Sequence, residues 1–278
     1  MERRGLAPAD GGVIAYLVVG EGPPIAATHP YVMPRSGYGA GGYAGVPGCT
    51  TVTVWPRGFA ESSKPRDEGD HWLTQVADDV EAVRRHLGFE RWAFWGTSMG
   101  GFVGLYYALR HQSSLCALVL DSTAASHHYA LDPDSIWPAL ATTAESRAWR
   151  ERPSPGTMSA YFTKMWEAMG APDAAAMQRD WLARMEFSDR ALVAILRRMP
   201  EFDMRPRLGE IGVPTLVLAG GRDRGCLPKE SRIIAEGIPG ATLRIFDHSG
   251  HGVLNQRPED VKDLVRDFVH GHAAIAAG

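Results

Sequence analysis

The chain has 278 residues, and its 29 Lys and Arg against 32 Asp and Glu give a formal charge of −3. This balance lacks the concentrated basic field that nucleic acid or an acidic membrane surface requires, so we expect neither as a partner. With 45% hydrophobic and 22% charged residues, the composition excludes disordered and fibrous classes and predicts a soluble globular protein of one large domain or two small ones.

The cysteines and the first residues indicate a compartment. Cys49, Cys116 and Cys226 are odd in number and form no CxxC pair, which disfavours a disulfide framework or a thiolate zinc site and suits a reducing environment. The first apolar run, Val13 to Val19, stops at Gly20 and is too short for a signal peptide or a membrane span. We therefore expect a cytoplasmic protein.

The N-terminal region is expected to contain two short strands. The turn residues Asp10-Gly11-Gly12 precede the apolar run Val13 to Val19, and a Gly/Pro-rich stretch separates this run from Ile25 to Thr28. We expect the chain to open as a hairpin.

From residue 50 the pattern changes to short buried runs that alternate with amphipathic helices, as in a parallel sheet covered on both faces. The predicted strands are Thr51 to Trp55, Trp92 to Trp95, Ala117 to Leu120, Thr215 to Ala219 and Thr242 to Phe246. The predicted helices have apolar stripes over 73–87, 102–109 and 261–268, with Gly88 after the first and Pro258 in the first turn of the last.

Residues 123–206 break this alternation, because their apolar residues fall at helical spacing and no β-rich run occurs. Three stripes are expected: Phe162, Met165, Trp166 and Met169; Met177, Trp181 and Met185; Leu192, Ile195, Leu196 and Met199. Seven of the ten Met and four of the eight Trp lie in this segment. The stripes either line a pocket or pack the helices on one another, and the sequence favours neither.

A G-x-S-x-G motif, Gly96 to Gly100, joins the strand-like run Trp92 to Trp95 to the helix that follows Gly101. In such a turn the serine adopts strained backbone angles, and side chains two positions away would collide with neighbouring backbone, so both flanking positions need glycine. The turn presents Ser98 at a helix N-terminus, where negative charge is stabilised. Ser98 is therefore a candidate nucleophile, and a plain turn before a helix is the alternative.

A serine nucleophile needs a base and an acid that orients the base. His251 lies between glycines in the loop after the strand Thr242 to Phe246, and Asp223 lies just past the strand that ends at Ala219. The order Ser98, Asp223, His251 places all three at the carboxyl ends of parallel strands, where ligands bind in open α/β sheets.

Other residues compete for these roles. Asp121, at a strand end, or Asp247 could replace Asp223 as the acid. His248 and His251 have H-x-x-H spacing but no third ligand nearby, so we expect no metal. Cys226 has no nucleophile motif of its own and is interpreted as a loop thiol.

Two further motifs are interpreted without a catalytic role. Gly37, Gly39 and Gly42 spell G-x-G-x-x-G, but no strand runs directly into them, so we expect a glycine-rich flap, not a dinucleotide site. The pair His127-His128 is interpreted as a polar helix entry that could also line a pocket.

Outside 123–206, the chain closely resembles the α/β-hydrolase family. The matching pieces are His29-Pro30-Tyr31, Arg57 to Ser62, Gly96 to Gly101, Pro214 to Asp223, and Ser249-Gly250-His251 followed by Pro258-Glu259. The resemblance implies a mostly parallel sheet with helices on both faces, formed by residues 1–122 and 207–278, and an inserted helical cap at 123–206. It also implies that Ser98, Asp223 and His251 form a catalytic triad.

The same resemblance implies an oxyanion hole made by the backbone N–H groups of Tyr31 and Met99. Two residues depart from the family pattern. Pro30 stands where the family usually has glycine, and because proline has no N–H the donor must be Tyr31. Trp55 stands where the family commonly has aspartate, which puts the local structural network in doubt but not the triad.

The implied function is that of a serine hydrolase that cleaves a carboxylic ester, lactone or thioester of an apolar small molecule, with no cofactor. His29, Trp137 and Trp166 are expected to contact the substrate, and the protein is expected to be a monomer or homodimer. The alternatives are a C–C bond hydrolase, a proline-iminopeptidase-like amidase, which would usually carry a Gly-Gly-Pro-Gly loop that is absent here, and a non-catalytic small-molecule binding protein on the same fold.

Overall fold

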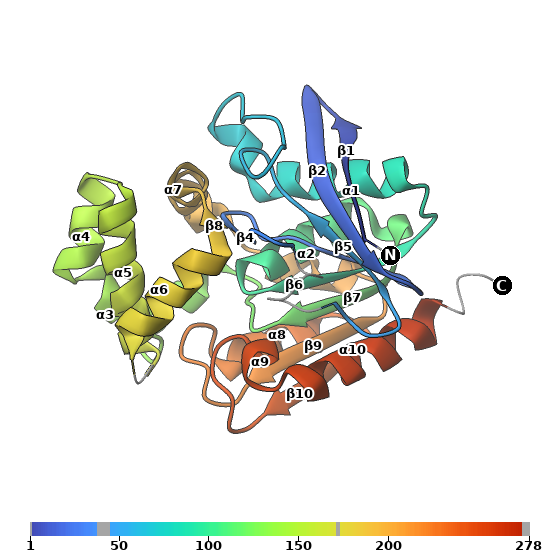
Figure 1. Cartoon of the computed structure of the whole chain (residues 1–278). Helices are drawn as coiled ribbons and strands as arrows, with labels where there is room; N and C mark the ends of the chain where they lie inside the picture. The colour runs from blue at the N-terminus through green and yellow to red at the C-terminus, as the bar shows by residue number, and fades with distance from the viewer. Residues whose placement is uncertain (1, 38–44, 171–172, 274–278) are drawn as a thin grey trace.

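A computed structural model, which describes residues 2–37, 45–170 and 173–273, contains an eight-stranded sheet with a helical segment to one side (Figure 1). The strands are β1 (Glu2–Ala9), β2 (Gly12–Gly20), β3 (Pro24–Ala27), β5 (Thr50–Val54), β6 (Trp92–Thr97), β7 (Leu115–Asp121), β9 (Thr215–Gly220) and β10 (Thr242–Phe246). Their spatial order is β1-β2-β5-β3-β6-β7-β9-β10. All neighbours from β5 to β10 are parallel, which confirms the predicted α/β class.

Both expected N-terminal strands exist, as β2 and β3, but the prediction that they form a hairpin with each other was wrong. β2 pairs with β1 through the turn at Asp10–Gly11, whereas β3 lies between β5 and β6 and does not pair with β2. β1 was missed because its sequence is charged and contains Gly and Pro, and an edge strand needs only one partner to form. Residues 20–24 therefore cross to a new place in the sheet, with Gly20 at φ 87° against the Cys49 carbonyl.

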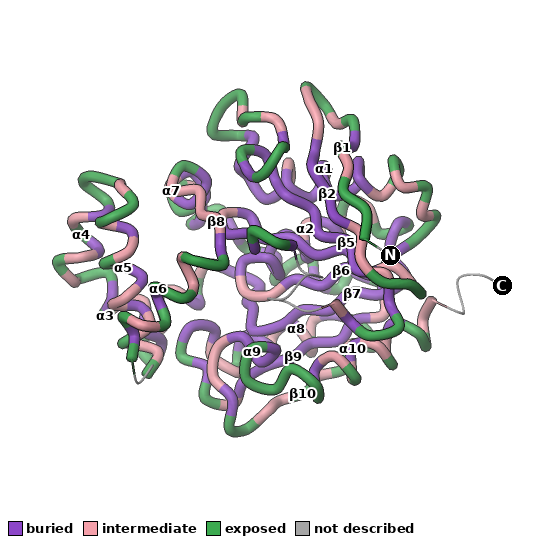
Figure 2. Tube along the Cα trace, viewed as in Figure 1, coloured by how far each residue is buried: buried purple, intermediate pink, exposed green. Residues whose placement is uncertain are grey.

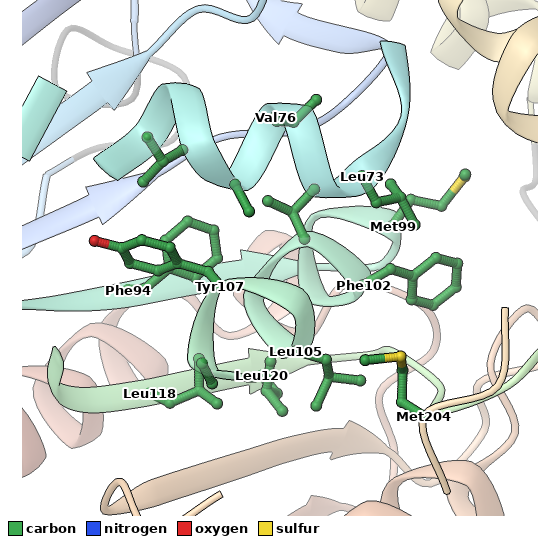
Figure 3. Close-up of a cluster of buried hydrophobic side chains, with 14 of the residues drawn as sticks. Leu73, Val76, Phe94, Met99, Phe102, Leu105, Tyr107, Leu118, Leu120 and Met204 are labelled. Carbon is green, nitrogen blue, oxygen red and sulfur yellow. The ribbon is translucent and has the colours of Figure 1, made fainter. Parts of the chain in front are cut away.

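Helices cover both faces of the sheet. The helices α1 (Leu73–Leu87), α2 (Met99–Arg110) and α8 (Pro228–Gly237) share one apolar cluster with β6 and β7, and α9 (Val253–Gln256) and α10 (Pro258–Ala273) share a second cluster on the other face. Figure 3 shows Val76 of α1, Phe102 of α2 and Phe94 of β6 among the side chains of the first cluster. Gly88 ends α1 at φ 75°, as predicted. We call the sheet with these five helices the sheet core.

Residues 123–206, which we call the helical segment, contain five α-helices in their described part: α3 (Trp137–Ala141), α4 (Ala144–Glu151), α5 (Pro155–Ala168), α6 (Ala174–Arg184) and α7 (Asp189–Arg198). The expectation of no strand here was wrong. β8 (Met185–Phe187) pairs antiparallel with β4 (Val32–Pro34), which follows Tyr31 in the sheet core's sequence. Three residues are too few to show a β pattern, so only the partner reveals such a strand.

The predicted stripes of the helical segment are only partly buried. Phe162 and Met165 of α5 are buried and pack with Trp149 and Leu192 inside the segment. Met177 and Leu196 were expected in stripes as well, but their exposed fractions are 42% and 38%. Figure 2 shows the same contrast, with β6 and β7 buried along nearly their whole length and exposed residues recurring along α3–α6. The helical segment thus leaves more of its residues exposed than the central strands of the sheet core do.

Trp55, which departs from the family pattern, and nearby Arg57 are both buried and have separate partners. Trp55 is buried and donates its Nε1–H to the Pro34 carbonyl at 3.3 Å. The fully buried Arg57 forms a bidentate ion pair with Asp79 of α1, with N···O distances of 3.0 and 2.9 Å. Asp79 was missed by the sequence analysis, since an acidic residue on a helix reads as a solvated face.

Within the described ranges, no helix is both long enough and apolar enough to cross a bilayer. The three cysteines are buried and free.

Candidate active site

Ser98 occupies a strained turn between β6 and α2. Its backbone angles are φ 54° and ψ −123°, and its N–H donates to the Asp121 carbonyl at 2.9 Å. A Cβ at Gly96 would lie 2.2 Å from the Gly100 carbonyl oxygen, and one at Gly100 would lie 2.7 Å from the Thr28 carbonyl oxygen. Both glycines are therefore sterically required, as the motif predicted. Ser98 lies at the N-terminus of α2, where backbone N–H groups lack helical partners.

His251 is held by Asp223. The ring Nδ1 lies 2.9 Å from Asp223 Oδ2, and Asp223 Oδ1 accepts the backbone N–H groups of Gly225 at 2.7 Å and Cys226 at 2.9 Å. The carboxylate is buried, with 1% of the residue exposed, whereas His251 is half-buried. With Nδ1 donating to the carboxylate, Nε2 is left as the basic nitrogen.

Burial disfavours the charged form of His251, but the attraction and hydrogen bond of Asp223 and the more distant charge of Asp121 outweigh it and raise its pKa above the ordinary value. A ring held in this way becomes a stabilised imidazolium when it takes a proton. This is the behaviour required of a general base that later returns the proton.

The Ser98 turn and the His251 loop meet over the end of β7. Ser98 bonds to Asp121 as described, and the next residue, Ser122, accepts the Gly252 N–H on its Oγ at 3.0 Å. Thr123 then donates its hydroxyl to the Ser98 carbonyl at 2.7 Å. The run 121–123 therefore fixes both loops. It was missed as a site, although three polar residues after a buried strand were a signal.

Of the three candidate acids, Asp223 is the one whose carboxylate bonds to His251. Asp121 is buried and is engaged by the Ser122 hydroxyl at 2.8 Å; burial raises its pKa to about 6 despite that bond. Asp247 is exposed.

The H-x-x-H pair is divided between different partners. His248 Nδ1 lies 3.2 Å from an Arg222 nitrogen, whereas His251 faces Asp223. In the part of the chain that the structure describes, no group of three His, Cys, Asp or Glu residues is placed to hold a metal ion.

The two expected oxyanion donors lie on opposite sides of the Ser98 turn in sequence. Met99 is the first residue of α2 and is buried. The Tyr31 carbonyl accepts the Ser188 N–H of the helical segment at 3.0 Å, and the Tyr31 ring stacks on Phe162 of α5 with centroids 6.5 Å apart. The loop that follows β3 is thus in contact with the helical segment.

His29 lies beneath Tyr31, with ring centroids 4.7 Å apart. It is 8% exposed, and its Nδ1 is buried without a hydrogen-bond partner within the described residues. Burial, with a smaller effect of His251, lowers its pKa to about 3, so the ring is neutral at physiological pH. A neutral ring beside Gly100 suits an apolar or hydrogen-bonding contact, not a charge partner.

The two tryptophans expected to contact substrate lie in different surroundings. Trp137 donates its Nε1–H to the Gly225 carbonyl, next to Asp223, at 2.6 Å. Trp166 donates its Nε1–H to Gln178 at 2.9 Å and lies edge-on to Trp181, and both of these partners belong to the helical segment. Met169, expected as part of an apolar stripe, lies near the same loop: a Cβ at Gly225 would lie 3.0 Å from its Cε and 3.1 Å from His251 Nδ1.

The remaining candidates stay outside the chemistry of this site. Cys226 is buried, and burial followed by the charge of Asp223 raises the pKa of its thiol well above the usual value, so it remains protonated. His127 and His128 begin a short 3₁₀ helix, and His128 contacts Arg205 at 3.0 Å. Gly39 and Gly42 of the G-x-G-x-x-G motif lie outside the described residues.

Comparisons with known proteins identify the family of this fold. A family model of the alpha/beta hydrolase fold matches residues 44–258. The AB hydrolase superfamily protein YisY of Bacillus subtilis is 27% identical over 222 residues, which cover 76% of this chain and 78% of that protein. The 3-oxoadipate enol-lactonase 2 of Acinetobacter baylyi is 27% identical, covering 69% of this chain and 68% of that protein. An alpha/beta fold family hydrolase from Bacillus anthracis superposes with a TM-score of 0.83 at 24% identity, covering 96% of this chain and 99% of that one.

Proposed function

Since the chain belongs to the α/β hydrolase fold family, we propose that it is a serine hydrolase that cleaves a carboxylic ester, lactone or thioester of an apolar small molecule through an acyl-enzyme. Support for an ester or lactone comes from the site and from the enol-lactonase among the relatives. The observation that carries the proposal is the Asp223–His251 hydrogen bond of 2.9 Å. The His251 loop and the strained Ser98 turn both form hydrogen bonds to residues 121–123.

In the proposed reaction, Ser98 Oγ attacks the carbonyl carbon while His251 Nε2 takes the hydroxyl proton. Asp223 keeps the imidazole in the tautomer that exposes Nε2 and stabilises the imidazolium. The N–H groups of Tyr31 and Met99 bind the oxyanion of the tetrahedral intermediate. His251 then gives the proton to the leaving alcohol or thiol. In the second half of the reaction His251 takes a proton from water, the water attacks the acyl-enzyme, and His251 returns the proton to Ser98 Oγ as the acid leaves. No step in this scheme uses a metal or cofactor.

The helical segment is proposed to be the cap of this site. Its β8 strand and Ser188 contact the loop that carries Tyr31, and its Trp137 and Met169 lie at the loop that carries Asp223. Flexible thioethers and large rings at these places favour apolar substrates. His29, which is neutral, is proposed to contact the substrate beside Gly100.

The central test is the Ser98→Ala variant. Removing the nucleophile of a triad should lower kcat for p-nitrophenyl esters by about 10³–10⁶-fold. A fluorophosphonate probe should label the wild type and fail to label the variant, because only an activated serine reacts with it. Ser113→Ala, an exposed serine after α2, serves as the matched control and should retain both activities.

Near-normal turnover by Ser98→Ala would exclude the proposed mechanism. A wild type that binds esters or lactones but neither hydrolyses them nor reacts with the probe would favour a binding protein on the same fold.

A further inference from the structure

Two adjacent residues of the helical segment bond to the backbone of the loop that follows Asp223. The Ile136 N–H donates to the Arg224 carbonyl at 2.9 Å, and the Trp137 indole N–H donates to the Gly225 carbonyl at 2.6 Å. An ion pair between Asp132, shortly before Ile136, and Lys229 of α8, shortly after Gly225, joins the same two stretches of chain. The loop is therefore fastened to the helical segment as well as to the sheet core.

The same loop holds the carboxylate. Gly225 presents its carbonyl to Trp137 and its N–H to Asp223 Oδ1, and the Cys226 N–H completes the pair of donors at that oxygen. The other oxygen, Oδ2, faces His251 Nδ1. A shift of Gly225 would therefore turn the carboxylate relative to the imidazole.

Little room surrounds Gly225. A Cβ there would lie 3.0 Å from Met169 Cε and 3.1 Å from His251 Nδ1. Trp137 is half-buried, and its ring lies edge-on to Tyr129 with centroids 6.1 Å apart, so its indole is held on one side by Tyr129 and at its N–H by Gly225. The side chain is thus fixed at the acid loop and does not hang free over the site.

We propose that Trp137 is a positioning residue for Asp223: its indole N–H, bonded to the Gly225 carbonyl, holds the loop whose amides orient the carboxylate toward His251. This inference rests on the proposed function of Ser98, Asp223 and His251. It gives Trp137 a role in the strength of the base, in place of the simple substrate contact that the sequence suggested.

The test is Trp137→Phe, which keeps an aromatic ring and removes the N–H. Loss of one buried hydrogen bond should lower kcat/KM about tenfold, chiefly through kcat. Neutral His251 is the base, and Asp223 favours its protonated form. A less well oriented carboxylate therefore lowers the pKa of His251, and the acidic limb of the kcat/KM profile should move to lower pH.

The rate of fluorophosphonate labelling should fall by a similar factor, because the probe needs the activated Ser98 but little recognition of an acyl chain. Trp149→Phe is the matched control: Trp149 is also a buried tryptophan of the helical segment, stacked on Tyr161, but its Nε1 has no partner within the described residues. It should change neither the labelling rate nor the acidic limb.

A higher KM for Trp137→Phe with an unchanged labelling rate and acidic limb would overturn the inference and leave the proposed function standing. An unreactive wild type would overturn the proposed function itself. If Trp137→Phe does not fold by circular dichroism, replacement of Trp137 by benzothienylalanine, which keeps the bicyclic shape without the N–H, gives the same two readouts.

Discussion

The sheet core and the helical segment are both built on aromatic side chains, but they pack them differently. In the sheet core, Trp92 is fully buried and donates to the Tyr107 hydroxyl at 2.9 Å, which in turn donates to Glu81 at 2.8 Å. In the helical segment, Trp149 is buried and its Nε1 has no partner among the residues that the structure describes, and Trp166 and Trp181 are only half-buried. Close-packed, hydrogen-bonded interiors resist change, whereas loosely buried rings and thioethers adapt to what they contact.

The two regions are nevertheless joined by hydrogen bonds to backbone carbonyls at the loops of the candidate site. On the side of Tyr31, the Arg35 and Ser188 N–H groups bond across the β4–β8 pair at 2.9 and 3.0 Å. On the side of Asp223, Trp137 bonds to Gly225. The helical segment, which we interpret as an adaptable layer, therefore lies directly against the sheet core, which we interpret as a rigid frame, at the loops where the chemistry is proposed.

The largest effect is expected from the buried ion pair of the sheet core. Asp79→Ala would leave the fully buried Arg57 without its bidentate partner, and Asp70 lies 3.9 Å away from a different guanidinium nitrogen. We expect the free energy of unfolding to fall by about 3–5 kcal/mol, measured by urea denaturation.

The matched control lies in the helical segment. Asp180 pairs with Arg184 on the surface of α6, where the two side chains are 62% and 54% exposed. Asp180→Ala should change stability by less than about 1 kcal/mol, because exposed pairs are solvated. Equal losses for the two variants would contradict the contrast between rigid frame and adaptable layer.

The boundary between the regions has a pH dependence of its own, carried by His29. Its folded pKa of about 3 lies below the ordinary 6.5, so between these values the unfolded chain binds a proton that the folded chain does not. Stability should therefore fall as pH drops from 6.5 toward 3, by up to about 1.4 kcal/mol per pH unit from this group.

His29→Gln removes that proton uptake and should flatten the decline. Urea denaturation of both proteins at pH 6.5, 5.5 and 4.5 gives the free energy of unfolding as a function of pH. The difference between the two slopes reports His29 alone, because the other titrating groups contribute equally to both proteins. Parallel lines for the two proteins would mean that the ring is protonated in the folded state, and that the layer formed by Tyr31 and Phe162 does not keep water from it.

The elements that could be predicted from the sequence lie mainly in the buried centre of the sheet core. The strands β6, β7 and β9 are buried on both faces, so their uninterrupted apolar runs identified them, and the glycine spacing around Ser98 reflects collisions that occur within one turn. β1 and the β4–β8 pair were missed, because edge and three-residue strands are decided by their partners and not by their own composition.

For the site, the sequence identified residues with a local pattern and missed those defined by distant contacts. Ser98 has a motif, and His251 and Asp223 follow predicted strands. Asp79 has no comparable signal, and the polar run that contains Ser122 is a weaker one, because the roles of these residues depend on Arg57 and on Gly252, which lie 22 and 130 residues away in the chain. Trp137 was recognised as a large ring, but its N–H contact could not be inferred from composition.

The smallest effect is expected in the adaptable layer and concerns substrate choice. Met169, half-buried just after α5, has its Cε near Gly225 in the loop that holds Asp223, so we expect its thioether to contact an acyl chain. Met169→Ala should lower kcat/KM for a p-nitrophenyl octanoate about tenfold while the acetate changes by less than about twofold, since a short acyl group gains little from the lost apolar contact. Met177→Ala, whose side chain is 42% exposed on α6, should alter neither ester. An equal loss for acetate and octanoate would assign Met169 to support of the Asp223 loop, whereas a selective loss for octanoate makes the helical segment the part of the molecule that measures the acyl chain.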